Sequence, residues 1–372
     1  MSFDFPGLEG HVYDEQDSLQ IVIEPITEKN KLLGCGSFGA VYLGKLNQSG
    51  KVSMLVAVKV HHPGYAPDPI LIDEYNFLKL LGGKHNVIEL LTHVYDSQRK
   101  IIHFIYPFFE ETPFCSLIVD ATKEEVRAYM RTLLTALAWL HLHNIIHKDV
   151  KWNNFLFNRF LLTGKLIDLG CACYMNELKE GCTRDPKLSG DYNFAPRLFY
   201  ITSPCITKQI YTKAHQKLPH KRRMGTPGYK PLESLLESDL ISSAVDIFAA
   251  GSIYVLLLLR KEIFFVQNTP GAGIMELCKL FGAHRVSEVA LHLGKTVTIK
   301  LNSSTEREMK DLSDTKEEVI FYRLRSTSSA YPERLWFSLC AFDLLKDLLA
   351  LSPSRRKTAA GALCHRFFKE PN

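Results

Sequence analysis

Two aspartates and an asparagine with defined spacing are the residues of this chain whose types could do chemistry together. Asp149 lies five residues before Asn154, and Asp168 opens an Asp-Leu-Gly triplet nineteen residues after Asp149. Phosphoryl transfer from ATP needs one carboxylate that orients the attacking hydroxyl, and an Asp and an Asn that hold Mg²⁺ against the phosphates. We therefore take Asp149 as the candidate catalytic base, and Asn154 and Asp168 as candidate magnesium ligands.

A glycine-rich segment precedes these residues and predicts a phosphate-binding loop. Gly34, Gly36 and Gly39 lie in Gly-Cys-Gly-Ser-Phe-Gly-Ala-Val. Glycines let backbone N–H groups approach phosphates without interference from a Cβ. The same pattern occurs in dinucleotide-binding folds, where a helix follows the glycines. Here residues 41–46 carry apolar side chains at alternate positions, which predicts a strand and argues against a dinucleotide-dependent oxidoreductase.

A lysine at the end of the next predicted strand could bind phosphates. Lys59 closes the apolar run Val-Ala-Val-Lys, twenty-five residues after Gly34. Such a Lys needs a carboxylate partner, and residues 70–81, which two glycines follow, are predicted to form the helix that supplies it. Glu74 is the preferred partner because it shares the apolar face of that helix, and Asp73 on the adjacent face is the alternative.

The order and spacing of these motifs resemble those of eukaryotic protein kinases, from about Leu33 to Phe368. The resemblance implies an α+β, bilobal protein kinase fold with a β-rich small N-lobe and a mostly helical C-lobe. We expect insertions in the activation segment and before the last helices. The expected parts are an N-terminal extension (1–19), the N-lobe (20–106), a hinge (107–112) and the C-lobe (113–372), with insertions near 172–223 and 286–335.

The resemblance also implies which residues act on ATP. Lys59 and Glu74 would form the ion pair that orients the α- and β-phosphates, and Lys151 would contact the γ-phosphate beside Asp149. Tyr106 would guard the back of the adenine pocket, next to the hinge. The residues expected to bind the nucleotide are Leu33, Gly34, Cys35, Gly36, Ser37, Phe38, Gly39, Val41, Ala57, Lys59, Tyr106 and Phe108.

Two residues indicate the class of substrate. In kinases, a Lys two residues after the catalytic Asp, here Lys151, marks Ser/Thr kinases, and Thr226 in Gly-Thr-Pro-Gly-Tyr points the same way. Two positions depart from the family pattern. Leu169 replaces Phe in the Asp-Phe-Gly triplet, and Lys148 replaces the Arg that usually forks onto a phosphorylated activation-loop residue. We therefore do not predict control by activation-loop phosphorylation.

Three further residues resemble structural residues of the kinase C-lobe. Glu233 follows Pro-Leu where most kinases have Ala-Pro, and it would pair with Arg356 near the C-terminus. Asp246 matches a buried Asp that organises the catalytic loop. These residues would hold the active site in shape without touching substrate.

Within the kinases, the chain resembles the DDK family, the replication-initiation kinases that a separate regulatory subunit activates. The resemblance lies in segments 106–110, 148–158 and 225–230 and in the two insertions. It implies ATP- and Mg²⁺-dependent phosphorylation of Ser or Thr in acidic segments of minichromosome-maintenance helicase subunits. It also implies an activating subunit and a nuclear location, with the cytoplasm as the alternative. The other readings are a casein-kinase-type acidophilic kinase and a pseudokinase scaffold, and the retained catalytic residues argue against the scaffold.

Composition and charge argue against nucleic-acid-binding, membrane and disulfide-rich classes of protein. The chain has 372 residues, a hydrophobic content of 46% and a net charge of +5 from mixed signs, so direct nucleic-acid binding is not predicted. The longest apolar run, 247–259, is shorter than the about 20 residues that span a bilayer, and the N-terminus has no signal pattern. No membrane association is therefore expected. The nine cysteines show no disulfide framework, so reduced thiols are expected.

The interval between Asp168 and Glu233 is about twice the usual kinase length, which predicts an insertion there. Cys182, Cys205, His215 and His220 in this interval could bind zinc, but no Cys-x-x-Cys pair supports that, and free thiols are preferred. The interval ends in a basic cluster that would attract acidic or prephosphorylated peptides, the alternative being a solvated loop. The cluster consists of Lys208, Lys213, Lys217, Lys221, Arg222 and Arg223.

Overall fold

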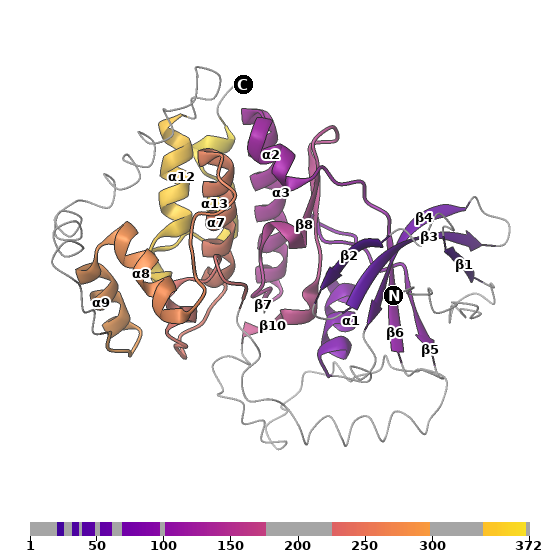
Figure 1. Ribbon diagram of the computed structural model, residues 1–372, viewed down its shortest axis with the longest axis horizontal. Helices are drawn as coiled ribbons and strands as arrows, with labels where there is room; N and C mark the ends of the chain where they lie inside the picture. Colours follow the sequence, from indigo (N-terminus) through magenta and orange to yellow (C-terminus); the bar gives the residue numbers. More distant parts are fainter. Residues whose placement is uncertain are drawn as a thin grey trace. The chain divides into compact units, whose positions relative to one another are not determined.

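The structure is a computed structural model of the chain, and its described residues form two compact units (Figure 1). The division falls between Glu110 and Glu111. Strands dominate the first unit and helices the second. Most of both predicted insertions, the possible zinc ligands and the basic cluster lie outside the described residues. The described residues are 21–25, 32–36, 39–48, 53–61, 69–96, 101–175, 225–297 and 338–369.

The first unit is built on an antiparallel sheet of six strands. The strands follow the order β1-β3-β4-β6-β5, and β2 pairs with β3. Alternate residues of β4, Val56 and Val58, are fully buried in an apolar cluster with residues of β3, β5 and β6. One face of the sheet is therefore packed as core. The strands are β1 (Ile21–Pro25), β2 (Leu32–Gly36), β3 (Gly39–Gln48), β4 (Met54–His61), β5 (Thr92–Asp96) and β6 (Ile101–Pro107).

Helix α1 (Pro69–Leu81) covers this sheet and confirms the helix that the sequence predicts over 70–81. The ring of Tyr75 in α1 lies 6.2 Å from that of Phe104 in β6, centroid to centroid. The helix ends at Gly82, whose N–H donates to the carbonyl of Leu78 at 2.8 Å. A Cβ at Gly82 would collide with that same carbonyl, so the residue type allows the stop.

The second unit is mainly helical, and α3 (Lys123–Leu142) begins with a capping box. The Thr122 hydroxyl accepts the Glu125 N–H at 3.2 Å, and the Glu125 carboxylate accepts the Thr122 N–H at 2.7 Å. The box therefore satisfies two N–H groups at the start of the helix. The other helices are α2 (Phe114–Asp120), α6 (Leu232–Leu235), α7 (Ala244–Leu259), α8 (Pro270–Phe281), α9 (Ala283–His292), α12 (Leu339–Leu349) and α13 (Ala359–Leu363).

Helix α7 is the buried centre of this unit, and all but its first residue are inaccessible to solvent. Helix α12 packs directly on α7 (Figure 1). A Cβ at Gly251 would lie 2.8 Å from Leu349 Cδ2 and 3.0 Å from Leu348 Cβ, so glycine permits this close approach. Although α7 is strongly apolar, no helix in the described part of the chain is both long and apolar enough to cross a membrane.

Two short antiparallel strand pairs frame the loops of this unit. Strand β8 pairs with β9, and β7 pairs with β10. The segment between β7 and β8 contains Asp149, and the segment between β9 and β10 contains Asp168. These short elements are β7 (Ile145–Ile146), β8 (Phe155–Asn158), β9 (Thr163–Leu166), β10 (Cys173–Tyr174) and the 3₁₀ turns η1 (Trp152–Asn154), η2 (Leu169–Cys171), η3 (Pro353–Arg355) and η4 (Arg366–Phe368).

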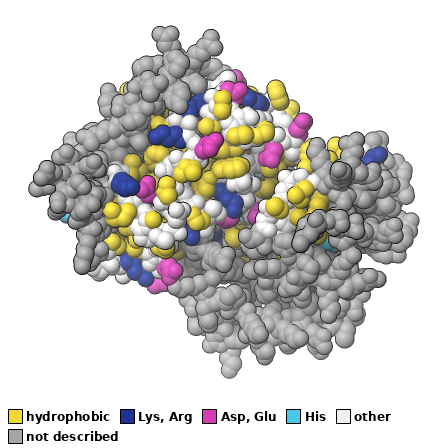
Figure 2. Space-filling view, in the orientation of Figure 1, with side chains coloured by type: hydrophobic (Ala, Val, Ile, Leu, Met, Phe, Trp, Pro, Cys, Tyr) yellow, Lys and Arg dark blue, Asp and Glu magenta, His cyan; other side chains and the backbone are white. Residues whose placement is uncertain are grey.

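The described surface carries charges of both signs. On the face drawn in Figure 2, basic and acidic side chains are interspersed with hydrophobic ones over the described residues. Single exposed apolar residues are normal on soluble proteins. Phe160, in the turn between β8 and β9, is the most exposed of the large hydrophobic residues described, at 89%.

Candidate active site

Lys59 and Glu74 form a buried ion pair within the first unit. Lys59 Nζ lies 2.7 Å from Glu74 Oε1, and the two side chains are 11% and 1% exposed. Glu74 lies on the same face of α1 as Leu71 and Leu78, which are also buried, whereas Asp73 is half-buried. Of the two carboxylates that the sequence offered, Glu74 is therefore the one that pairs with Lys59 in the structure.

The strand register places four of the predicted nucleotide-binding residues on one face of the sheet. Val41 in β3 is the cross-strand partner of Lys59 in β4, and Ala57 in β4 is the partner of Tyr106 in β6. Directly opposed residues share a face, as do residues two apart in one strand. The ammonium of Lys59 and the apolar side chains of Val41, Ala57 and Tyr106 therefore line the same surface.

The glycine-rich segment forms the turn-flanking ends of β2 and β3. Gly34 and Gly36 are in β2, where an added Cβ would meet nothing within 4 Å. Gly39 opens β3, and a Cβ there would collide with the carbonyl of Val60. Cys35 lies between the two β2 glycines with an exposed free thiol. The predicted contacts at Ser37 and Phe38 lie outside the described residues.

Two other predicted nucleotide contacts lie at the edges of this surface. Leu33 is in β2 and is 37% exposed, so it is available to cover a ligand. Phe108 follows β6, and its N–H donates to the carbonyl of Leu55 at 3.1 Å. Its carbonyl, rather than its N–H, would therefore be the backbone group that Phe108 offers to an adenine.

The second unit holds the loop that contains Asp149, and Asp246 of α7 fixes its backbone. Asp246 Oδ1 accepts the N–H of Lys148 at 2.8 Å, and Oδ2 accepts the N–H of His147 at 2.9 Å. A ring nitrogen of His141 lies 2.9 Å from the same Oδ2. Because Lys148 has a positive φ of 64°, a strained value for a non-glycine residue, these bonds hold the loop in a shape it would not adopt alone. The expected organising role of Asp246 fits this geometry.

Asp149 is held by two other candidate residues. Lys151 Nζ donates to Asp149 Oδ2 at 2.7 Å and to Thr226 Oγ1 at 3.1 Å. The Thr226 hydroxyl donates to Asp149 Oδ1 at 2.6 Å. A carboxylate, an ammonium and an aliphatic hydroxyl thus meet in one triangle of hydrogen bonds. The arrangement can orient a hydroxyl nucleophile at Asp149 and present a positive charge beside it.

The two candidate magnesium ligands suit that ion by chemistry and by orientation. The Asn154 amide nitrogen donates to the Asp149 carbonyl at 2.9 Å, which leaves the amide oxygen of this buried side chain to serve as a ligand. Asp168 has a left-handed backbone, with φ of 61° and ψ of 72°, and its side chain is half-exposed. Mg²⁺ prefers such oxygen donors with few protein ligands, and it would neutralise phosphate charge when bound.

Neighbouring pKa values show the combined field of the two aspartates. Burial, reinforced by the charges of Asp149 and Asp168, raises the pKa of the Cys171 thiol to about 11. Burial and the charge of Asp149 also raise the pKa of the Tyr229 phenol well above its ordinary value. Both groups therefore stay neutral at physiological pH.

Residues 225–230 form a loop that we call the substrate-side loop, and Gln267 holds its backbone. No motif in the sequence indicates this role of Gln267. Its side-chain oxygen accepts the N–H groups of Gly228 and Lys230 at 2.8 and 3.2 Å, and its amide nitrogen donates to the Lys230 carbonyl at 3.0 Å. The residue is only 4% exposed. A single Gln outside the loop thus fixes its backbone, and only the tertiary fold brings the two together.

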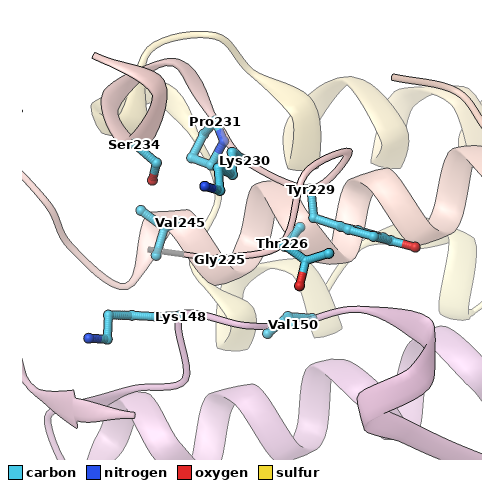
Figure 3. A pocket seen from close by; sticks show the side chains of 10 residues that line it. Lys148, Val150, Gly225, Thr226, Tyr229, Lys230, Pro231, Ser234 and Val245 are labelled. Carbon is cyan, nitrogen blue, oxygen red and sulfur yellow. The ribbon is translucent and has the colours of Figure 1, made fainter. Parts of the chain in front are cut away.

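A small pocket lies between this loop and the Asp149 loop (Figure 3). Lys148 and Lys230 line it from opposite sides, and the Ser234 hydroxyl lies near its upper rim in the view. Lys148 is only 6% exposed, and within the described parts of the chain its ammonium has no hydrogen-bond or ion-pair partner. The two lysines give the lining of this pocket a positive charge, which would attract an anion.

The predicted pair between Glu233 and Arg356 is confirmed. Arg356 Nη1 lies 2.6 Å from Glu233 Oε1, and both side chains are fully buried. The guanidinium also donates to the carbonyls of Ala244, Ala350 and Leu351. Because Glu233 follows the substrate-side loop directly, this pair ties the loop to the C-terminal helices.

Comparisons with known proteins agree with this geometry. Residues 27–368 match the family model described as the protein kinase domain. Over 340 residues the chain is 29% identical to the probable cell division control protein 7 homolog 1 of Encephalitozoon cuniculi, which covers 91% of this chain and 90% of the relative. It is 34% identical to the non-specific serine/threonine protein kinase Cdc7 of Drosophila melanogaster, over 90% of this chain and 73% of the relative.

Solved structures show the same fold. A chain of the CAK complex from Chaetomium thermophilum bound to ATP-gamma-S superposes with a TM-score of 0.64 at 21% identity, over 91% of this chain and 90% of the other. The predicted bilobal kinase fold is therefore confirmed, and the chain belongs to the protein kinase family. Within that family its relatives place it among the Cdc7-type cell division control kinases, as the resemblance to the DDK family predicts. It is thus an ATP-dependent protein serine/threonine kinase of the cell division control type.

Proposed function

We propose that this kinase acts in the nucleus to promote the initiation of DNA replication. Its substrates would be Ser and Thr residues in acidic segments of minichromosome-maintenance helicase subunits. Asn154 and Asp168 would hold Mg²⁺, and a separate regulatory subunit would activate the chain. The names of the Cdc7-type relatives and the DDK-like segments around Asp149 and Thr226 support this assignment.

The contact of Thr226 and Lys151 with Asp149 is the observation that supports catalytic activity, on which the proposal depends. The Thr226 hydroxyl reaches one carboxylate oxygen at 2.6 Å and the Lys151 ammonium reaches the other at 2.7 Å. Asp149 would accept a hydrogen bond from the substrate hydroxyl, and Lys151 would neutralise charge on the transferred phosphoryl group. Positioning and charge stabilisation provide most of the catalysis in phosphoryl transfer, so a built triangle of this kind favours an active kinase over a scaffold.

The preference for acidic segments is supported by the pocket beside this triangle. Lys148 lies buried there without a described counter-charge, and Lys230 faces the same space. A carboxylate or phosphate that enters would gain charge-assisted hydrogen bonds. The basic cluster of the activation segment, which lies outside the described residues, would add attraction at longer range.

We propose a regulatory subunit because the chain resembles the DDK family and because the first unit carries its ion-paired Glu74 on helix α1. The similar solved chain belongs to the CAK complex. In kinases the helix that bears the ion-paired Glu is a common control point, because the pair forms only when that helix is in place. Here that helix is α1, so a partner that contacts α1 could stabilise the Lys59–Glu74 pair.

The experiment is a phosphate-transfer assay on purified helicase subunits, with the kinase alone and with proteins that copurify with it from its source cell. We expect phosphoserine and phosphothreonine, a requirement for Mg²⁺, and stimulation by a copurifying protein. Asp149→Asn and Asp168→Ala should each reduce transfer by at least about 10³-fold while the fold is retained. Substantial activity of either variant, or predominant phosphotyrosine, would contradict the assignment.

The second candidate is a casein-kinase-type enzyme with many acidic targets. The pocket lined by Lys148 and Lys230, which we call the cationic pocket, supports this candidate as well as it supports the replication kinase. The same assay separates the two by including a generic acidic peptide. A replication kinase should prefer the helicase subunits over the peptide by at least about tenfold in kcat/KM. Equal rates, together with no stimulation by a copurifying protein, would favour the casein-kinase type.

A further inference from the structure

Trp152 is an exposed aromatic residue inside the catalytic loop. It directly follows Lys151, which contacts Asp149, and it is 37% exposed. An exposed aromatic ring beside a functional site is a common recognition element.

A rigid support holds this indole. Its ring stacks on that of Phe114, the first residue of α2, with centroids 5.3 Å apart and planes only 5° from parallel. Phe114 in turn packs against Tyr129, at 6.0 Å, and Tyr129 contacts Phe155 and Phe157. Phe114 is 8% exposed, so the lower ring is buried while the upper one offers its free surface. This aromatic platform, Trp152 on Phe114, is thus fixed before any ligand arrives.

The platform lies at the other end of the substrate-side loop from the cationic pocket. The backbone of Trp152 lies close enough to the Tyr229 phenol to influence its pKa. In Figure 3 the Tyr229 ring points away from the ammoniums of Lys148 and Lys230, and Thr226 lies between them. Because Thr226 contacts Asp149, the order along the site is cationic pocket, reacting centre, aromatic platform.

We propose that the aromatic platform is a subsite for an apolar side chain of the substrate, one to three residues before the phosphoacceptor. The proposal rests on the proposed function in one respect, that the cationic pocket takes an acidic residue after the phosphoacceptor. With that end fixed, an extended chain that advances about 3.3 Å per residue brings the preceding residues to the opposite end. A Leu, Phe or Met there would cover the exposed indole face, so the substrate pattern is an apolar residue, then Ser or Thr, then an acidic residue.

Four sets of peptides with one central Ser test the two ends separately. Each peptide carries Leu or Gly at one of the three preceding positions, and Asp or Gly at the position after Ser. For the wild-type kinase we expect Leu to raise kcat/KM about tenfold at one of the three positions, chiefly through KM, a ratio that corresponds to about 1.4 kcal/mol. Asp in place of Gly should raise kcat/KM independently.

Variants assign the preference for Leu to the platform. In Trp152→Ala the Leu-to-Gly ratio should fall from about ten to about one, whereas Trp152→Phe should keep an intermediate ratio. Phe160→Ala removes a more exposed aromatic ring that lies outside the catalytic loop, in the turn between β8 and β9, and should leave the ratio unchanged. In all variants the Asp-to-Gly ratio should remain that of the wild type, which shows that the reacting centre is intact.

The outcomes distinguish this inference from the function on which it rests. A wild-type Leu-to-Gly ratio near one at all three positions, or an undiminished ratio in Trp152→Ala, would overturn the platform. An Asp-to-Gly ratio near one, with a normal response to Leu and to Trp152→Ala, would instead overturn the acidic preference and leave the platform standing. If Trp152→Ala lowers both ratios together, the residue shapes the loop and does not contact substrate, and the inference is wrong.

Discussion

Lys59 and Glu74 form an ion pair in which both side chains are buried. We expect Glu74→Gln to lower kcat/KM by at least about 10²-fold and the free energy of unfolding by about 3 kcal/mol, because it removes the negative charge from a buried ion pair. Asp73→Asn, one position away on the half-buried face, should be close to wild type in both respects. Steady-state kinetics and thermal unfolding of the same preparations measure kcat/KM and stability for both variants. An inactive Asp73→Asn beside a normal Glu74→Gln would show that Asp73 is the working partner.

The Thr226 hydroxyl tests whether the triangle around Asp149 matters for the chemical step. Thr226→Val keeps the shape and removes the hydroxyl that donates to Asp149 at 2.6 Å. Loss of one such charge-assisted hydrogen bond should cost about 1.5–3 kcal/mol of transition-state stabilisation, or about 10- to 150-fold in kcat. Thr226→Ser retains the hydroxyl and should recover most of that loss. Equal kcat for the two variants would mean that the hydroxyl only shapes the loop.

The residues that the sequence predicts for the site are those whose function depends on type and spacing. Asp149 and Asn154 share one short loop, so their separation along the chain already restricts their separation in space. Gln267 could not be predicted in this way. It contacts the substrate-side loop across 37 residues of chain, and an amide side chain has no preferred spacing to the backbone groups it binds. The stacking of Trp152 on Phe114 was missed for the same reason, because it joins separate elements.

Among the helices, the packing of α12 on α7 depends on one glycine. Gly251→Ala adds a methyl group 2.8 Å from Leu349 Cδ2 in a buried interface, and we expect it to lower stability by about 1–3 kcal/mol. Gly271 in α8 is the matched control, because a Cβ there meets nothing within 4 Å. Gly271→Ala should be neutral or stabilise by up to about 1 kcal/mol. Chemical unfolding of the three proteins gives the comparison, and equal stabilities would show that α12 shifts without cost.

Helices with strong local signals are those that the sequence predicts well. Helix α1 ends at two glycines and matches its predicted range within one residue, and the Thr-x-x-Glu capping box of α3 is a signal of the same local kind. Helix α9 reaches into a segment predicted as an insertion, and its sequence gives little warning of it. It buries only Val286 and Ala290, and so short an apolar stripe cannot be told from a polar loop by periodicity.

For the molecule as a whole, the net charge of +5 is too small and too mixed to select a substrate by itself. Selection by charge must come from where the cations gather. Lys148 and Lys230 supply two at the pocket, and the basic cluster of the activation segment would supply six more if it lies near the substrate-side loop. The first two act by contact, whereas exposed charges act over about 8 Å at physiological ionic strength and mainly raise the rate of encounter.

That difference in range predicts a salt signature for the basic cluster. Replacement of Lys221, Arg222 and Arg223 by Ser should lower kcat/KM for an acidic peptide about three- to tenfold at low salt. The same replacement should change kcat/KM for a neutral peptide little. The control variant replaces Lys123, Lys261 and Lys369, three exposed residues elsewhere, by Ser. It loses the same net charge, and its kcat/KM for the acidic peptide should stay near that of the wild type. Raising the salt should remove the defect of the first variant, because screening weakens exposed charges but leaves the buried Lys148 contact largely intact. Equal losses in both variants would mean that net charge, and not the cluster, attracts the substrate.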